Sequence, residues 1–111
     1  MGRYFLFKNA CKYGHLDMVK FLVSKGADPK NRRAFAGACG YGHLEVAKYL
    51  ASKGADVKDN WAFENACEYG HLEVVKYLMS KGADFDYEYV FICAKYYNQH
   101  HILEYLKQCR G

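Results

Sequence analysis

Histidine and cysteine are the residues of this 111-residue chain that could bind a metal or act as nucleophiles. Each type recurs at intervals of 28 residues: His15, His43 and His71, and Cys11, Cys39 and Cys67. A zinc site needs three or four ligands that converge on one point, usually with ligand pairs close in sequence. Constant spacing at 28 residues indicates a structural repeat instead. We therefore expect turn histidines that hydrogen-bond the loop backbone, buried cysteines, and no metal or cofactor.

Catalytic motifs are missing from the rest of the chain. It has no glycine-rich phosphate loop, no H-E-x-x-H and no G-x-S-x-G. Each Gly-Ala-Asp copy offers one carboxylate, whereas a calcium loop needs several within twelve residues. A nucleophilic cysteine would need a base and an orienting group beside it. We predict that the protein is not an enzyme, with Cys109 as its most exposed thiol.

Two motifs define the repeat. Tyr-Gly-His-Leu begins at Tyr13, Tyr41 and Tyr69, and Ser-Lys-Gly-Ala-Asp begins at Ser24, Ser52 and Ser80. In a fourth copy, Asn98-Gln99-His100 stands where the third has Gly-His-Leu. We therefore predict one domain over residues 1–111, made of units near 1–28, 29–56, 57–84 and 85–111.

Each unit has the pattern of two helices. In residues 59–82, Asp59 or Asn60 is a suitable N-cap, and apolar residues follow at helical spacing. Gly70 permits a tight turn, a stronger apolar stripe begins at Leu72, and Gly82 ends the second helix. Such a helix pair buries its apolar face only by stacking on neighbours, so the pattern predicts an all-α solenoid of four helix-turn-helix units.

The stretch from Gly70 to Leu78, followed by Lys81 to Asp84, resembles the second helix and exit loop of an ankyrin repeat. The resemblance implies an α-solenoid that binds other proteins. The usual ankyrin unit has 33 residues, and the five missing here fall where that family forms its β-hairpin finger. We expect these fingers to be shortened or absent. The shortened units are similar to ankyrin arrays of giant DNA viruses of amoebae, which implies a viral origin.

Aromatic residues supply the candidate binding surface. Tyrosines recur at the ends of the predicted first helices, and bulky residues recur at their beginnings. In ankyrin stacks the first helices line the concave face, and the resemblance places the contact positions there. The predicted partner-binding residues are Lys12, Tyr13, Arg33, Gly40, Tyr41, Trp61, Glu68, Tyr69, Tyr89, Tyr96 and Tyr97. For the recurring tyrosines, a packing role beside the turn is the alternative to a contact stripe.

Charge is unevenly distributed along the chain, whose net charge is +4. Residues 1–56 carry ten Lys and Arg against four acidic residues, and residues 57–111 carry six against eight. The basic half could steer an acidic partner toward Lys30, Arg32 and Arg33. It also admits nucleic-acid binding, which we rank below the binding of a protein or peptide.

Three further expectations concern the surroundings of the chain. No run of about 18 apolar residues is present, so we expect no membrane span. Free cysteines and the lack of a signal peptide favour a cytoplasmic, reducing compartment. Phe5, Leu6 and Phe7 have no polar cap before them, so we expect a monomer or a weak dimer through the N-terminal end. A fragment of a longer repeat array is a further alternative, against which the polar fourth unit argues.

Overall fold

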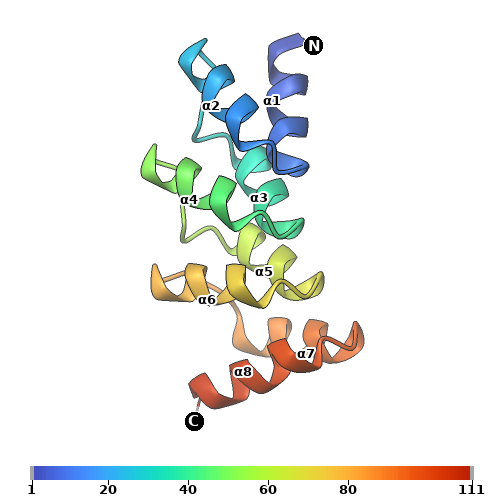
Figure 1. Cartoon of the computed structure of the whole chain (residues 1–111). Helices are drawn as coiled ribbons and strands as arrows, with labels where there is room; N and C mark the ends of the chain where they lie inside the picture. The colour runs from blue at the N-terminus through green and yellow to red at the C-terminus, as the bar shows by residue number, and fades with distance from the viewer. Residues whose placement is uncertain (1, 111) are drawn as a thin grey trace.

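A computed structural model describes the backbone of residues 2–110 and the side chains of residues 4–109. Over this range the chain forms eight helices and no strand. The helices are α1 (Gly2–Lys12), α2 (Leu16–Ser24), α3 (Arg32–Gly40), α4 (Leu44–Ser52), α5 (Asn60–Glu68), α6 (Leu72–Ser80), α7 (Tyr87–Tyr96) and α8 (His100–Arg110). The fold is thus the predicted all-α repeat solenoid, with helix pairs stacked from one end to the other (Figure 1).

Side-chain caps begin three of the helices. Asn31 accepts a hydrogen bond from the Ala34 amide, and Asp59 accepts one from the Trp61 amide. Asp86 does the same for the Tyr89 amide, so α3, α5 and α7 all start at an Asn or Asp. Each cap satisfies an amide that the first helical turn leaves without a backbone partner. Of the two predicted caps for α5, Asp59 is the one used.

Residues with positive φ form the turns within the units. Gly42 and Gly70 have φ of 81° and 82°, a conformation in which a Cβ atom is unfavourable. In the fourth unit Asn98 takes this place with φ of 59°, and asparagine is one of the few side chains that tolerate it. The helix pair therefore continues through the unit whose motif is altered.

Small residues let the first helices, α1, α3, α5 and α7, pack closely on one another. Ala38 and Cys39 have no exposed surface, and the equivalent Ala66 and Cys67 are buried in the same way. The second helices, α2, α4, α6 and α8, contribute Leu50 and its counterparts Leu22, Leu78 and Leu106 to one continuous core. The described part of the chain forms a rod with extents of 45 × 23 × 19 Å, in which the repeating cysteines are buried as predicted.

The loops between units lack the β-hairpin fingers of a longer repeat. Residues 53–59 and 81–86 connect helices directly, and in the described chain no strand forms there. One backbone hydrogen bond, from the Asp84 amide to the Lys58 carbonyl, joins the neighbouring loops over 3.2 Å. The absence of five residues per unit thus removes the finger and leaves the helix pair intact.

The histidines lie between units, where the side chain of one unit covers the turn of the unit before it. His43 covers Gly14, His71 covers Gly42, and Gln99 covers Gly70. We call these three the seam contacts. His71 hydrogen-bonds the backbone of Gly40, and the Gln99 Nε2 donates to the Glu68 carbonyl over 3.0 Å. His71 therefore bonds to backbone, but its partner is the last residue of α3 in the preceding unit and not loop backbone as predicted.

Candidate functional site

One side of the first helices carries half-buried and exposed residues in rows. In α5 this side presents Trp61, Glu64 and Glu68, which are three and four positions apart and so share a helix face. In α7 the same positions are Tyr89, Ile92 and Tyr96, of which Ile92 is 61% and Tyr96 is 78% exposed. We call this side the first-helix face. Large apolar side chains with so much free surface are typical of binding surfaces when they are grouped.

Tyrosines follow the C-terminal ends of the first helices along the whole rod. Tyr13, Tyr41, Tyr69 and Tyr97 are 56%, 48%, 57% and 47% exposed. Their rings therefore lie outside the core. The Tyr13 and Tyr41 rings meet edge to face with centroids 6.3 Å apart. A tyrosine in this position offers an apolar ring and a hydroxyl to a partner at a small loss of conformational entropy.

Lys12 lies within this aromatic stripe. Its Nζ is 5.4 Å from the centroid of the Tyr13 ring and 5.1 Å from that of the Tyr41 ring. A hydrogen bond with the Tyr41 side chain, assisted by the charge interactions with both phenols, raises the pKa of Lys12. The rings thus hold the ammonium group at the surface as a fixed positive charge in the first unit.

Carboxylates lie on the same face in the third unit. Partial burial, followed by the nearby Asp86, Asp59 and Glu68, raises the pKa of Glu64. Glu68 interacts with the Tyr97 hydroxyl, and this hydrogen bond is the main reason that the pKa of Tyr97 is raised. The first-helix face is therefore positive around Lys12 and negative around Glu64 and Glu68.

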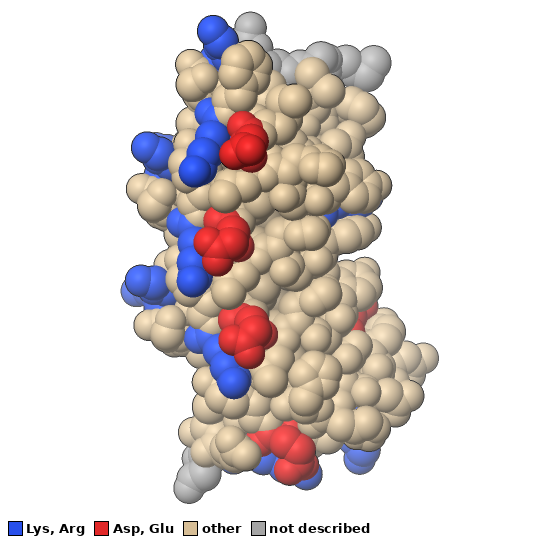
Figure 2. Space-filling view, viewed as in Figure 1, with Lys and Arg blue, Asp and Glu red and all other residues tan. Residues whose placement is uncertain are grey.

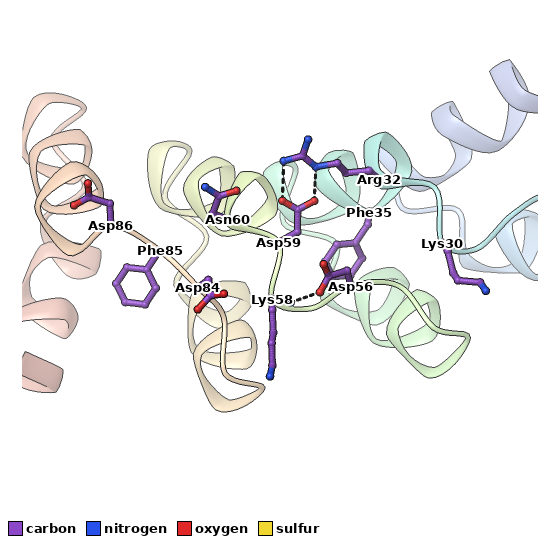
Figure 3. Close-up of a pocket in the computed structure, with 10 residues that line it drawn as sticks. All are labelled: Lys30, Arg32, Phe35, Asp56, Lys58, Asp59, Asn60, Asp84, Phe85 and Asp86. Atoms are coloured by element: carbon purple, nitrogen blue, oxygen red, sulfur yellow. Dashed lines mark hydrogen bonds and ion pairs between the residues drawn. The ribbon is translucent and has the colours of Figure 1, made fainter.

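A groove runs beside this face along the loops that precede the first helices (Figure 3). Its open volume is about 790 Å³, and its lining includes Phe35, Phe85 and the carboxylates of Asp56 and Asp84. Within it the Arg32 guanidinium holds the Asp59 carboxylate by two hydrogen bonds, of 2.5 and 2.9 Å. Arg32 also lies over the Trp61 ring, 5.0 Å from its centroid. The Arg32–Asp59 ion pair therefore forms part of the wall of this groove.

At three predicted positions the burial or the pairing of the residue differs from what a free contact residue would have. Gly40, predicted as a contact position, is buried, and a Cβ atom there would lie 3.2 Å from the Cβ of Asn65, so this position packs against the next unit. Trp61 is half-buried against the core. Arg32 forms an ion pair with Asp59. Arg33, by contrast, is exposed and has no ion pair or hydrogen bond among the described residues. Arg33 is thus the free arginine of the predicted basic cluster.

Sequence reasoning did not select Glu64 and Ile92 as surface residues. Both lie three positions after a selected residue on the same helix, Trp61 in α5 and Tyr89 in α7. The i, i+3, i+7 rule would have found them. Among the described residues, no three His, Cys, Asp or Glu side chains are grouped so that they could hold a metal ion. The site thus consists of aromatic rings with separated positive and negative charges.

Comparison with known families identifies these units. A family model described as "Ankyrin repeats (3 copies)" matches residues 1–61, more than half of the chain, and one described as "Ankyrin repeat" matches residues 58–86. The chain belongs to the ankyrin repeat family. A search of curated proteins finds no match. Ankyrin repeats serve in general as protein–protein interaction modules and are generally non-enzymatic. Within the described range, no helix has the length and apolar character needed to cross a bilayer.

Proposed function

We propose that this ankyrin chain binds a protein or peptide, without catalysis, through its first-helix face. The observation that supports the proposal is the row of exposed tyrosines that accompanies every first helix. Aromatic side chains at the centre of an interface often carry most of its binding energy. The second helices instead expose ordered acid–base pairs such as Glu45–Lys48 and Glu73–Lys76. Pairs of red and blue side chains recur down the visible face in Figure 2.

The order of charges narrows the kind of partner. Lys12 and Arg33 make the first-helix face positive in the first two units, and Glu64 and Glu68 make it negative in the third. A partner that lies along the rod would place acidic groups against α1 and α3 and basic groups against α5. Charge order of this kind sets orientation and association rate more than affinity.

Nucleic-acid binding through the basic half is the alternative. It would use free cations between aromatic rings, with an affinity that falls steeply as salt rises. Arg32 is already paired with Asp59. The negative charge of Glu64 and Glu68 would repel phosphates from the second half of the chain. An electrophoretic shift assay at low salt separates the alternatives, because no shift is expected from a protein-binding module.

The proposal is tested by affinity capture with the purified chain as bait, followed by mass spectrometry. Tyr69→Ala, at a position 57% exposed, should lower the recovery of the captured partner by about tenfold with little change in melting temperature. The matched control is Phe21→Ala on α2, where the ring is 55% exposed but lies on a second helix. It should leave recovery unchanged.

Two results would contradict this assignment. Equal recovery by the wild type and the Tyr69→Ala variant would exclude the tyrosines as contacts. A large fall in melting temperature for Tyr69→Ala would instead make that ring part of the packing. Trp61→Ala is a less suitable probe, because the half-buried ring also contacts Arg32 and the core.

A further inference from the structure

The first unit holds a cation between the tyrosines of two neighbouring units. The Nζ of Lys12 is 5.4 Å from the ring centroid of Tyr13 in its own unit and 5.1 Å from that of Tyr41 in the next. A cation over an aromatic ring is attracted by the negative face of the ring. The stack therefore forms a cation site where the side chain at the end of a first helix lies beside two successive tyrosines.

The same position in the third unit carries the opposite charge. Glu68 stands two repeats after Lys12, and the two tyrosines that correspond to those of the first unit are Tyr69 and Tyr97. They are 57% and 47% exposed, and the Tyr97 hydroxyl donates a hydrogen bond to the Glu68 carboxylate. Among the described residues, Glu68 has no ion pair with a lysine or arginine. We call Glu68, Tyr69 and Tyr97 the Glu68 seat, which has rings and a carboxylate but no cation of its own.

Arginine is the cation that fits these groups best. A guanidinium group can lie on an aromatic ring while its N–H groups bond to a carboxylate, whereas an ammonium group is a compact point charge. The chain itself contains this arrangement, because Arg32 donates two hydrogen bonds to Asp59 (Figure 3) and lies 5.0 Å from the centroid of the Trp61 ring. Beside the seat, the 78% exposed Tyr96 offers a further ring to the apolar stem of an arginine.

We propose that the Glu68 seat binds an arginine side chain of the partner. The inference rests on the proposed function, since it places this arginine on a protein or peptide at the first-helix face. Charge complementarity favours such an occupant at the third unit. The first unit already holds the ammonium group of Lys12 in the equivalent place and would repel a second cation. The seat therefore fixes which end of the rod receives the basic part of the partner.

Titration of the chain with acetyl-arginine amide, followed by NMR of the tyrosine rings, tests the proposal. The ring signals of Tyr69 and Tyr97 should shift and saturate, with a dissociation constant of about 10 mM for this single side chain. Acetyl-citrulline amide has a similar shape without the charge and should cause shifts about tenfold smaller or less. Acetyl-lysine amide, which matches the ionic strength, should bind about threefold more weakly.

Two glutamates of α5 provide a matched pair of variants. Glu68→Gln and Glu64→Gln remove the same charge from positions one helical turn apart. Glu68→Gln should weaken binding of the arginine compound by about fivefold or more, and Glu64→Gln by less than about twofold. Circular dichroism checks that both remain helical.

A third variant transfers the seat to the first unit. Lys12→Glu places a carboxylate beside Tyr13 and Tyr41, so these two rings should then respond to the arginine compound as well. In the wild type they should shift little, because Lys12 occupies that place. No response of these rings in the variant would show that the repeat geometry does not form the seat, and would overturn the proposal.

Three other results would overturn it. They are the absence of saturable shifts at Tyr69 and Tyr97, equal weakening by the two glutamine variants, and binding of the citrulline or lysine compound as tightly as the arginine compound. Failure of the proposed function gives a different result. If Tyr69→Ala lowers partner capture although the arginine compound does not bind, only the seat is refuted. If the compound binds as expected while Tyr69→Ala leaves capture unchanged, the first-helix face is refuted as the partner site and the arginine seat remains.

Discussion

Replacement of Gly42 by alanine tests whether the seam contacts hold the units together. Gly42 has φ of 81°, and a Cβ atom there would lie 2.5 Å from Nδ1 of His71 in the next unit. Ordinary contacts of this kind are about 3.5 Å, so the imidazole must move. Its movement would break the hydrogen bond from His71 to the backbone of Gly40.

Gly82 offers a matched control for the backbone effect. Its φ is 82°, and the nearest atom to a Cβ placed there is Cε of Lys58, at an ordinary 3.6 Å. In both alanine variants the free energy of unfolding should fall by about 1–2 kcal/mol, because an L-residue is unfavourable at positive φ. Only Gly42→Ala also displaces a partly buried ring and its hydrogen bond, worth a further 1–3 kcal/mol or so. We expect a total loss near 3 kcal/mol at Gly42, roughly twice that at Gly82.

Urea unfolding followed by circular dichroism measures both losses. A double-mutant cycle then assigns the difference. In a His71→Ala background no ring opposes the new methyl group, so Gly42→Ala should cost only what Gly82→Ala costs. Equal losses for the two single glycine variants, within about 0.5 kcal/mol, would refute the reasoning. So would additive effects of Gly42→Ala and His71→Ala.

Three further predictions follow from individual groups. Burial is the main cause that lowers the pKa of His71, so the folded chain binds that proton less readily than the unfolded chain. The contribution of His71 to the unfolding free energy should be full above the ordinary histidine pKa of about 6.5 and should decline as the pH falls below that value. His71→Gln, which places the residue type of Gln99 here, should reduce this decline in urea titrations. A chromogenic thiol reagent should react quickly with Cys109 and with none of the three thiols whose pKa burial raises to about 12: Cys11, Cys39 and Cys67. Asp59→Ala should lower the unfolding free energy by about 1–2 kcal/mol through loss of the α5 cap and the Arg32 contact, whereas Asp59→Asn, which can still cap, should lose less in the same assay.

The helix pairs were predictable because each signal is local. The spacing of apolar residues, the cap at Asp59 and the glycine at position 70 act within one unit, so one copy of the motif is enough to place both helices. The seam contacts were only partly predictable. The sequence indicates that His71 can bond to backbone, but the identity of its acceptor depends on how the preceding unit sits against it.

Surface positions were harder to predict for the same reason. The residue type at the position of Gly40 differs from unit to unit, and such variation is what a free surface position would show. Asn65 of the next unit lies over it, a contact between residues 25 positions apart that periodicity within one helix cannot reveal. The sequence also could not predict whether Tyr69 is exposed, because a tyrosine beside a turn can either pack against the turn or contact a partner. Only the arrangement of adjacent units separates the two.

The fourth unit shows what a seam requires. Its turn has Asn98 for glycine and Gln99 for histidine, and the family models end at residue 86, yet α7 and α8 continue the stack. Gln99 covers Gly70 and donates to the backbone of the preceding unit, as the imidazole of His71 does one unit earlier. The requirement is therefore a residue that tolerates positive φ, followed by a flat side chain with a hydrogen-bonding nitrogen. Stacking depends on this geometry rather than on the motif itself, which leaves most of the first-helix face free to vary with the partner.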